Sequence, residues 1–197
     1  MIAGIVLAAG ASRRLGEAKQ GVRLGPETLL ERAVRVAVEA GLEPVVVVVS
    51  AGLKLEDCVG KVDGFRVLIN EAAEEGMASS IRVGVGVAFV GQGGADGVVV
   101  MACDQPAVTA GHLRALMAGG DEVVGSEYAG RRGVPAYFPR RVFGELMELR
   151  GDVGARELLQ GARCVELVGG ELDVDTREEL ERARELFGDP RLKPWVT

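Results

Sequence analysis

One stretch near the start of the chain limits the possible folds and functions more than any other. Residues 4–7 predict a β-strand, and residues 8–19 (AAGASRRLGEAK) follow it directly. A strand that runs into Gly, Ala and Ser indicates a loop that approaches a ligand closely, because Gly10 and Gly16 have no Cβ atom. The same stretch carries three cations, Arg13, Arg14 and Lys19. Cations beside exposed backbone N–H groups are typical of a polyphosphate site, and the alternative is an ordinary turn with solvated basic side chains.

Short aliphatic runs alternate with helix-like segments along most of the remaining chain. Strands are predicted at 45–49, 65–69, 97–102 and 163–168, and helices at 27–40, 53–62, 79–88, 109–117, 139–149, 153–159 and 176–186. Gly25-Pro26 should open the first of these helices and Gly41 should end it. The alternation implies an α/β fold with a mostly parallel sheet and helices on both faces. Two further runs, at 122–126 and 134–138, predict a small antiparallel addition.

The composition is consistent with this fold. Of the 197 residues, 48% are apolar but only 4% are aromatic, which is typical of an aliphatic core around a parallel sheet. The run at 45–49 consists of valines alone, so both faces of that strand should be covered. The length fits one domain, predicted over residues 1–187, and the two prolines of residues 188–197 indicate an irregular tail.

Charge, hydropathy and cysteine content argue against several classes of protein. The net charge of −6 is unfavourable for broad nucleic-acid binding. No apolar run reaches the roughly 20 residues that span a membrane, and the first residues lack the basic region of a secretory signal. Three cysteines without a CxxC pair indicate reduced thiols and a cytoplasmic location. His112 is the only histidine, which argues against a multi-histidine metal site and a histidine-activated nucleophile.

Polar side chains follow several of the predicted strands. Asn70 and Asp104 each come directly after one, and Asp173 and Asp175 lie in a DVDT segment before the last helix. In sheets of this kind ligands bind beyond the carboxyl ends of the strands, where these side chains and the first loop can meet. Carboxylates suit Mg²⁺ bound jointly with phosphates. The alternative for a lone Asp after a strand is a turn or cap residue.

A cationic glycine loop and one or two carboxylates are sufficient for phosphoryl-type transfer, which needs positioning and charge neutralisation more than covalent chemistry. An acceptor that is a phosphate monoester is already ionised near neutral pH. Such an acceptor needs no general base, which fits a chain with one histidine. The loop matches neither the P-loop pattern nor the dinucleotide fingerprint, and the glycines Gly84 and Gly86 lie inside a predicted helix, where they serve packing.

Residues 7–19 resemble a known signature, L-A-A-G-x-S-x-R-x-G-x-x-K. This signature is found in nucleotidyltransferases of the NTP-transferase superfamily that act on the molybdenum cofactor. Further segments resemble the family in the same order: GPETLL at 25–30, N-x5-GMASS at 70–80, DQP at 104–106, GVP at 133–135, GDVGAR at 151–156 and DVDT at 173–176. The resemblance implies a single-domain, three-layer Rossmann-like nucleotidyltransferase fold.

The branch that the chain resembles most is molybdenum cofactor cytidylyltransferase. Its members join CMP from CTP to the terminal phosphate of molybdopterin, release pyrophosphate and use Mg²⁺. Ala9 favours this branch, because the guanylyl branch resembles L-A-G-G here and has Asp before the lysine, where this chain has Ala18. The resemblance also implies a molybdoenzyme client as a partner.

The resemblance assigns a role to individual residues. The catalytic residues implied are Arg14, Lys19 and Asp104. The nucleotide-binding residues implied are Leu7, Ala8, Ala9, Gly10, Ser12, Arg13, Gly16, Asn70, Ser79 and Ser80. The acceptor-binding residues implied are Gln105, Gly133, Pro135, Asp152 and Arg156. The metal ligands implied are Asp104 and one of Asp173 and Asp175.

Departures from the family leave alternatives open. Relatives often carry Pro and Trp where this chain has Glu71 and Ala73, so that side of the pocket should differ in shape and charge. One alternative is a nucleotidyltransferase that uses GTP or another NTP, or that acts on a sugar phosphate or another phosphorylated alcohol. Another is a nucleotide-binding maturation factor without turnover, which the intact Arg14, Lys19 and Asp104 argue against.

Overall fold

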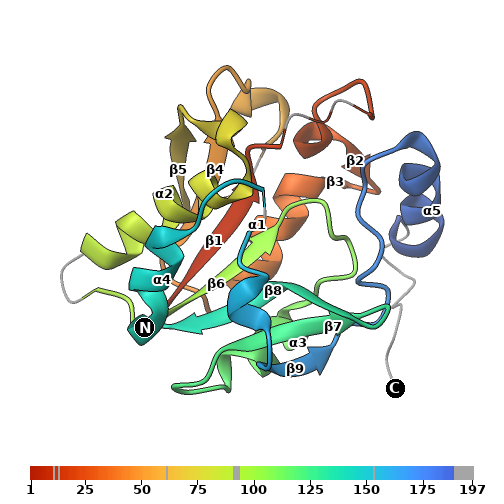
Figure 1. Ribbon diagram of the computed structural model, residues 1–197. Coiled ribbons are helices and arrows are strands. Elements are labelled where there is room, and N and C mark those ends of the chain that lie inside the picture. The colour runs from red at the N-terminus through yellow and green to blue at the C-terminus, as the bar shows by residue number, and fades with distance from the viewer. Residues whose placement is uncertain (11, 13, 61, 91–93, 153, 189–197) are drawn as a thin grey trace.

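The computed structural model describes residues 1–10, 12, 14–60, 62–90, 94–152 and 154–188. Within these residues a seven-stranded sheet has the order β5-β4-β1-β6-β8-β7-β9 (Figure 1). Its strands are β1 (Ile2–Ala8), β4 (Val45–Ser50), β5 (Phe65–Asn70), β6 (Gly97–Ala102), β7 (Val124–Tyr128), β8 (Arg131–Pro139) and β9 (Arg163–Glu166). Only β8 runs antiparallel to its neighbours, β6 and β7, so the expected mostly parallel sheet with an antiparallel addition is confirmed.

Helices cover both faces of this sheet. The helices are α1 (Leu29–Glu39), α2 (Met77–Val90), α3 (Ala110–Met117), α4 (Phe143–Glu148) and α5 (Arg177–Phe187). Alternate side chains of β1 point to opposite faces, so Ile5 and Leu7 pack in the cluster under α2 and α4, while Val6 and Ala8 pack in the cluster under α1, α3 and α5. The result is the three-layer arrangement that was predicted.

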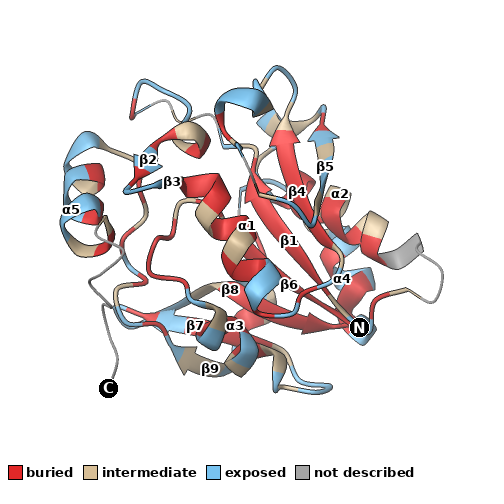
Figure 2. Cartoon of the chain, turned by 180° about the vertical axis from the view of Figure 1, so that it is seen from behind, coloured by how far each residue is buried: buried red, intermediate tan, exposed pale blue. Residues whose placement is uncertain are grey.

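Burial differs between the centre and the edge of the sheet. The five valines of β4 are all buried, which confirms that both faces of this strand are covered (Figure 2). On the edge strand β5, by contrast, Val67 and Ile69 are exposed. Of the helices that the structure describes, none combines the length and the apolar character needed to cross a bilayer.

The predicted start of the first helix is wrong. Two short strands that the sequence analysis missed, β2 (Arg23–Leu24) and β3 (Glu27–Thr28), form a separate antiparallel pair. Gly25 lies in the turn between them with a φ of 66°, so Gly25-Pro26 closes a hairpin. Helix α1 begins only after Thr28, which forms a capping box with Glu31.

The helix predicted at 53–62 is also wrong, and a short 3-10 turn at Leu55–Asp57 stands in its place. Backbone groups of this segment bond to other parts of the chain. The carbonyl of Cys58 accepts a hydrogen bond from Thr28 Oγ1 at 2.6 Å, and the N–H of Gly60 donates to Glu31 Oε1 at 2.8 Å. These tertiary bonds use groups that an α-helix would need for its own ladder.

Glycine geometry explains the second misplaced helix. Of residues 154–159, the described part of the helix predicted at 153–159, only Glu157–Leu159 are helical, and they form a 3-10 turn. Gly154 has a φ of 58°, in the left-handed region, which a right-handed helix does not contain. Val153 and most of the predicted irregular tail, from residue 189 onward, lie outside the described residues.

Candidate active site

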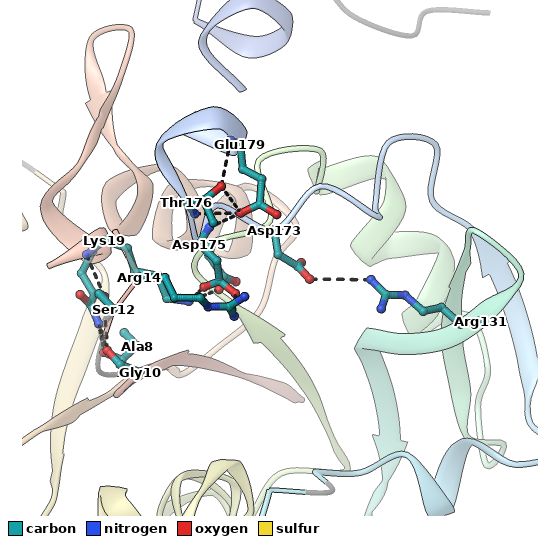
Figure 3. A network of polar contacts seen from close by, with 12 residues as sticks. Ala8, Gly10, Ser12, Arg14, Lys19, Arg131, Asp173, Asp175, Thr176 and Glu179 are labelled. Atoms are coloured by element: carbon teal, nitrogen blue, oxygen red, sulfur yellow. Dashed lines mark hydrogen bonds and ion pairs between the residues drawn. The ribbon is translucent and has the colours of Figure 1, made fainter. Parts of the chain in front are cut away.

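The loop after β1 is folded tightly around Ser12. The Ser12 carbonyl accepts hydrogen bonds from the N–H groups of Leu15 and Gly16 at 3.2 and 3.3 Å. The Ser12 hydroxyl oxygen accepts from the N–H of Lys19 at 3.0 Å (Figure 3). Gly16 has a φ of 82°, which glycine adopts without strain. These bonds bring Lys19 back beside the end of β1.

Gln20, which the sequence analysis did not single out, ties both ends of this loop together. Its buried amide Nε2 donates to the carbonyls of Ala8 and Gly10 at 2.6 and 3.1 Å. The next residue, Gly21, packs closely on a neighbouring segment, because a Cβ there would lie 3.1 Å from the carbonyl oxygen of Asp57. Leu7 and Ala8 are buried within β1, and the chain becomes accessible at Ala9 and Gly10.

A cavity of about 440 Å³ opens beside this loop, and we call it the loop-side cavity. Its lining includes Gly10, Ser12, Gly16 and Gln20 from the loop, Ser50 at the end of β4 and Leu53 just after it. The structure thus brings three of the predicted nucleotide-binding residues to one hollow. Arg13, which carries the same prediction, lies outside the described residues.

Lys19 lies at the centre of an ion-pair network that joins distant parts of the chain. Its ammonium group contacts the carboxylates of Asp104, which follows β6, and of Asp175, at 2.9 Å in the second case. The side chains of Lys19 and Asp104 are only 12% and 13% exposed. Arg14 contacts the other oxygen of Asp175 at 2.8 Å but is itself 72% exposed (Figure 3).

The charge state of Lys19 follows from these contacts. Burial by itself would lower the pKa of the ammonium group. The negative charge and hydrogen bond of Asp104, together with the hydrogen bond of Asp175, outweigh this effect and raise the pKa above its ordinary value. Lys19 therefore remains a cation throughout the physiological pH range.

Asp173 and Asp175 meet different partners, as the alternation of side chains in an extended segment requires. Asp175 faces the loop cations, and its N–H donates to Glu179 at the start of α5. Asp173 faces Arg131, with the charged atoms 3.8 Å apart (Figure 3). Burial, and then repulsion by Asp104, raise the pKa of Asp173 to about 6 although the Arg131 charge opposes the shift.

A second cavity, of about 260 Å³, has Lys19 and Asp104 in its lining. Three arginines, Arg131, Arg132 and Arg156, line it together with Lys19, and we call it the arginine-lined cavity. Four residues predicted to bind the acceptor also line it: Gln105, Gly133, Asp152 and Arg156. Asp173 and Asp175 both reach the same cavity.

One wall of the arginine-lined cavity is an interruption in the β7–β8 ladder. The register jumps from the pair Gly125–Ala136 to the pair Ser126–Gly133, which places Val134 and Pro135 in a bulge. Pro135, predicted to bind the acceptor, lies behind the wall. Its carbonyl accepts a hydrogen bond from the buried Ser126 hydroxyl at 2.5 Å.

The only histidine supports this bulge. His112 Nε2 lies 2.7 Å from the Ser126 hydroxyl oxygen. The Ser126 hydroxyl donates to the Pro135 carbonyl, and the His112 ring lies against the same hydroxyl oxygen. Burial lowers the pKa of His112 to about 4, and a bond to the Glu166 backbone only partly opposes this. Ser126 is fully buried, so the pair is structural and not a nucleophile with its base.

Asn70, Ser79 and Ser80 bond to one another. Asn70 Nδ2 donates to the hydroxyl oxygens of Ser79 and Ser80 at 2.8 and 2.9 Å, and Asn70 Oδ1 accepts from the N–H of Ala72 at 3.0 Å. All three predicted nucleotide-binding side chains are buried. They join the end of β5 to the start of α2, and none of the three is among the residues that line the two cavities.

The arrangement of carboxylates fits a divalent cation completed by a ligand. Asp104 and Asp175 converge on one point, because both contact the same ammonium group of Lys19. Among the described residues, no group of three or more His, Cys, Asp or Glu side chains could hold a metal ion alone. Two carboxylates plus substrate phosphates and water is the coordination that Mg²⁺ prefers.

The sequence analysis missed several residues of the arginine-lined cavity, among them Met77, Tyr128, Arg131 and Arg132. The sequence did contain a signal for the two arginines. The hairpin between two antiparallel strands beside a parallel sheet has its turn at the carboxyl edge, and this turn carries two adjacent arginines. Arg131 also lies over the Tyr128 ring at 5.2 Å, which fixes the direction of its guanidinium group.

Comparisons with known proteins identify the family of the chain. A family model described as a MobA-like NTP transferase domain matches residues 4–167. The chain is 33% identical over 196 residues to the purine catabolism protein PucB of Bacillus subtilis, covering 92% of this chain and 95% of PucB. It is 35% identical over 141 residues to a probable molybdenum cofactor guanylyltransferase of Opitutus terrae, covering 70% of this chain and 66% of that protein.

A solved structure is similar over nearly the whole chain. Rv0371c from Mycobacterium tuberculosis superimposes with a TM-score of 0.80 at 34% identity, covering 93% of this chain and 97% of that one. A manganese complex of the same protein superimposes with a TM-score of 0.74 at 31% identity, covering 93% and 98% of the two chains.

Proposed function

Because the chain belongs to the family of MobA-like NTP transferase domains and is a nucleotidyltransferase, we propose that it transfers CMP from CTP to the terminal phosphate of molybdopterin. The observation that carries this proposal is the convergence of Lys19, Asp104 and Asp175 at the end of the glycine loop. One cavity adjoins the glycine loop, and the other is lined by arginines.

The loop-side cavity suits the nucleotide. Its wall is the glycine-rich turn after β1, where backbone groups can approach a ligand closely. Arg14 and Lys19 supply the positive charge for a triphosphate, Arg14 from an exposed position and Lys19 from a buried one. We therefore assign the triphosphate to the space between this loop and Asp104.

Asp104 and Asp175 would hold Mg²⁺ in this arrangement. The bound ion would neutralise charge on the phosphates and on the departing pyrophosphate. Asp175 is the better candidate of the DVDT pair, because it shares a cation with Asp104 while Asp173 faces Arg131. Asp173 then belongs to the acceptor side of the site.

The arginine-lined cavity suits a phosphorylated acceptor, because guanidinium groups match the geometry of phosphate oxygens. The acceptor phosphate oxygen forms a bond to the α-phosphorus of the nucleotide, and the bond from that phosphorus to the pyrophosphate oxygen breaks. A phosphate monoester is ionised near neutral pH, so the reaction requires no general base. This agrees with the structural role of His112, which faces Ser126.

A second candidate uses GTP. The observation that favours it is the 35% identity to a protein named as a probable guanylyltransferase. Ala9 in place of a second glycine favours CTP. Another phosphorylated acceptor, such as a sugar phosphate, would meet the same arginines. A maturation factor without turnover is disfavoured because Lys19 and Asp104 are both in place.

Two assays test the proposal in sequence. Thermal unfolding with Mg²⁺ and each of CTP, GTP, ATP and UTP should give the largest stabilisation with CTP. Pyrophosphate release should then require molybdopterin in addition to CTP. If GTP stabilises the protein most, GTP and not CTP is the nucleotide donor. If pyrophosphate is released with a sugar phosphate but not with molybdopterin, the sugar phosphate is the acceptor. We also propose a cytoplasmic location and a molybdoenzyme client, which fit the free thiols of Cys58, Cys103 and Cys164 and the family.

A further inference from the structure

We propose, on the basis of the function proposed above, that Lys19 occupies the metal position in the nucleotide-free enzyme and leaves it only when a triphosphate arrives. Metal and triphosphate would then enter together. The site would discriminate against a free divalent cation and against nucleotides with too few phosphates to attract the lysine.

The first step of the argument is the place of the ammonium group. Lys19 Nζ lies within hydrogen-bond distance of one oxygen of Asp104 and of one oxygen of Asp175. These two oxygens are the atoms that would coordinate a cation between the carboxylates. The Lys19 and Asp104 side chains are nearly buried, so water screens little of the charge between them.

The second step is that the two cations exclude each other. An ammonium group and a divalent ion between the same two carboxylates would be separated by only a few ångströms, at which like charges repel strongly in a poorly solvated site. A metal ion that arrives alone must therefore displace Lys19 from both partners. The buried ammonium would then be left without a counter-charge, which is costly.

The third step is that Lys19 has another position within reach. A Cβ added to Gly10 would lie 3.4 Å from Lys19 Cε and 3.8 Å from Nζ, so the lysine stem runs along the glycine of the loop. The ammonium is thus next to the proposed phosphate position already. Lysine carries a point charge on a flexible stem, and rotation of the stem alone can move this charge from the carboxylates toward a bound triphosphate.

Arg14, unlike Lys19, does not occupy the position between the two carboxylates. It also contacts Asp175, but through the oxygen that does not bind Lys19, and its side chain is 72% exposed. An exposed ion pair of this kind exchanges with water and salt easily. Arg14 therefore does not block the position between the carboxylates.

The test is a titration with Mn²⁺ alone. The concentration of unbound Mn²⁺ is measured by electron paramagnetic resonance at each step. Wild-type protein should bind Mn²⁺ weakly. Lys19→Met keeps the apolar stem but removes the charge, so it should bind Mn²⁺ about tenfold more tightly, a typical size for coupling between sites. Lys19→Arg restores a cation and should bind as weakly as wild type. Lys54→Met, an exposed lysine, makes the same change in net charge and should leave Mn²⁺ affinity unchanged.

Two results would overturn the proposal. One is a folded Lys19→Met protein that binds Mn²⁺ no more tightly than wild type. The other needs no variant: tight, saturable binding of Mn²⁺ to the wild-type protein without nucleotide would show that the metal position is open. The titration contains neither a nucleotide nor an acceptor. A negative result would therefore leave the assignments of CTP and molybdopterin intact, and the titration can be interpreted even if those assignments prove wrong.

Discussion

The hydroxyl group of Tyr128 donates a hydrogen bond to the carbonyl oxygen of Val134 at 3.0 Å, across the point where the β7–β8 ladder is interrupted. A side chain therefore replaces a backbone bond that the bulge removes. Ser126 does the same for Pro135. Two hydroxyl groups of β7 thus fix the shape of the wall that faces the arginine-lined cavity.

Tyr128→Phe tests this relationship. The change removes one hydroxyl and leaves the Val134 carbonyl without its partner, so we expect a loss of about 1–2 kcal/mol in the free energy of unfolding. We also expect a higher KM for the acceptor with an unchanged KM for the nucleotide. The matched control is Tyr137→Phe on β8, whose hydroxyl donates to the Gly120 carbonyl at 2.8 Å, away from the cavity. An equal rise in acceptor KM in both variants would contradict the role of Tyr128.

Lys19→Ala and Asp104→Ala should each lower turnover by about a hundredfold or more, because each removes charge that stabilises the phosphates during transfer. Both proteins should remain folded by circular dichroism. Pyrophosphate release measures the effect, with Lys54→Ala as a control for net charge. Near-normal release from either variant would show that the assigned role is wrong.

Two glycines of α2 should respond to alanine in opposite directions. A Cβ on Gly84 would lie 2.5 Å from Cγ2 of the buried Ile5, whereas Gly86 has no described heavy atom within 4 Å of that position. Gly84→Ala should therefore destabilise by about 1–3 kcal/mol through overpacking. Gly86→Ala should stabilise by about 0.5–1 kcal/mol, because alanine has the higher helix propensity. Chemical denaturation measures both, and equal changes would contradict the packing of α2 on β1.

His112 makes stability depend on pH in a defined window. Its pKa of about 4 in the folded protein is lowered by burial from the ordinary value of 6.5. Between these values the unfolded chain binds the proton and the folded protein does not, so acidification from pH 6.5 to 4 favours unfolding by about 3 kcal/mol at most. Below pH 4 both states are protonated and the effect no longer grows.

The corresponding measurement compares wild type with His112→Asn, which cannot titrate. The difference in the free energy of unfolding between the two proteins should change between pH 6.5 and 4.5 and stay constant above pH 7.5. Other acidic groups titrate alike in both proteins and cancel. A difference that does not vary with pH would mean that His112 has the same pKa in the folded and the unfolded protein.

The parts of the fold that follow from continuous local signals were predicted well. The valine-rich runs predicted β4 and β6 within one residue. Helices were predicted from residues 109 and 176, and Thr109 and Thr176 are the N-caps of α3 and α5. The position of Asp104 after β6 followed from the same signal. These features depend on residues that are close in sequence.

The parts that were missed depend on contacts between distant residues. The hairpin β2–β3 and the turn at Leu55–Asp57 are fixed by bonds from Thr28 and Glu31. The aliphatic runs of the sequence do not show that β8 inserts between β6 and β7. For this reason Arg131 and Arg132, in the β7–β8 hairpin, were not predicted to lie at the site. The choice between Asp173 and Asp175 likewise required knowing which one meets Lys19.

The most direct test of the central claim is a crystal grown with Mn²⁺ and a non-hydrolysable CTP analogue, with the metal located by anomalous diffraction. We expect the metal between Asp104 and Asp175, the triphosphate against the loop after β1, and the Lys19 ammonium on the phosphates. Metal bound away from these two carboxylates, or a nucleotide at the opposite end of the sheet, would contradict the account.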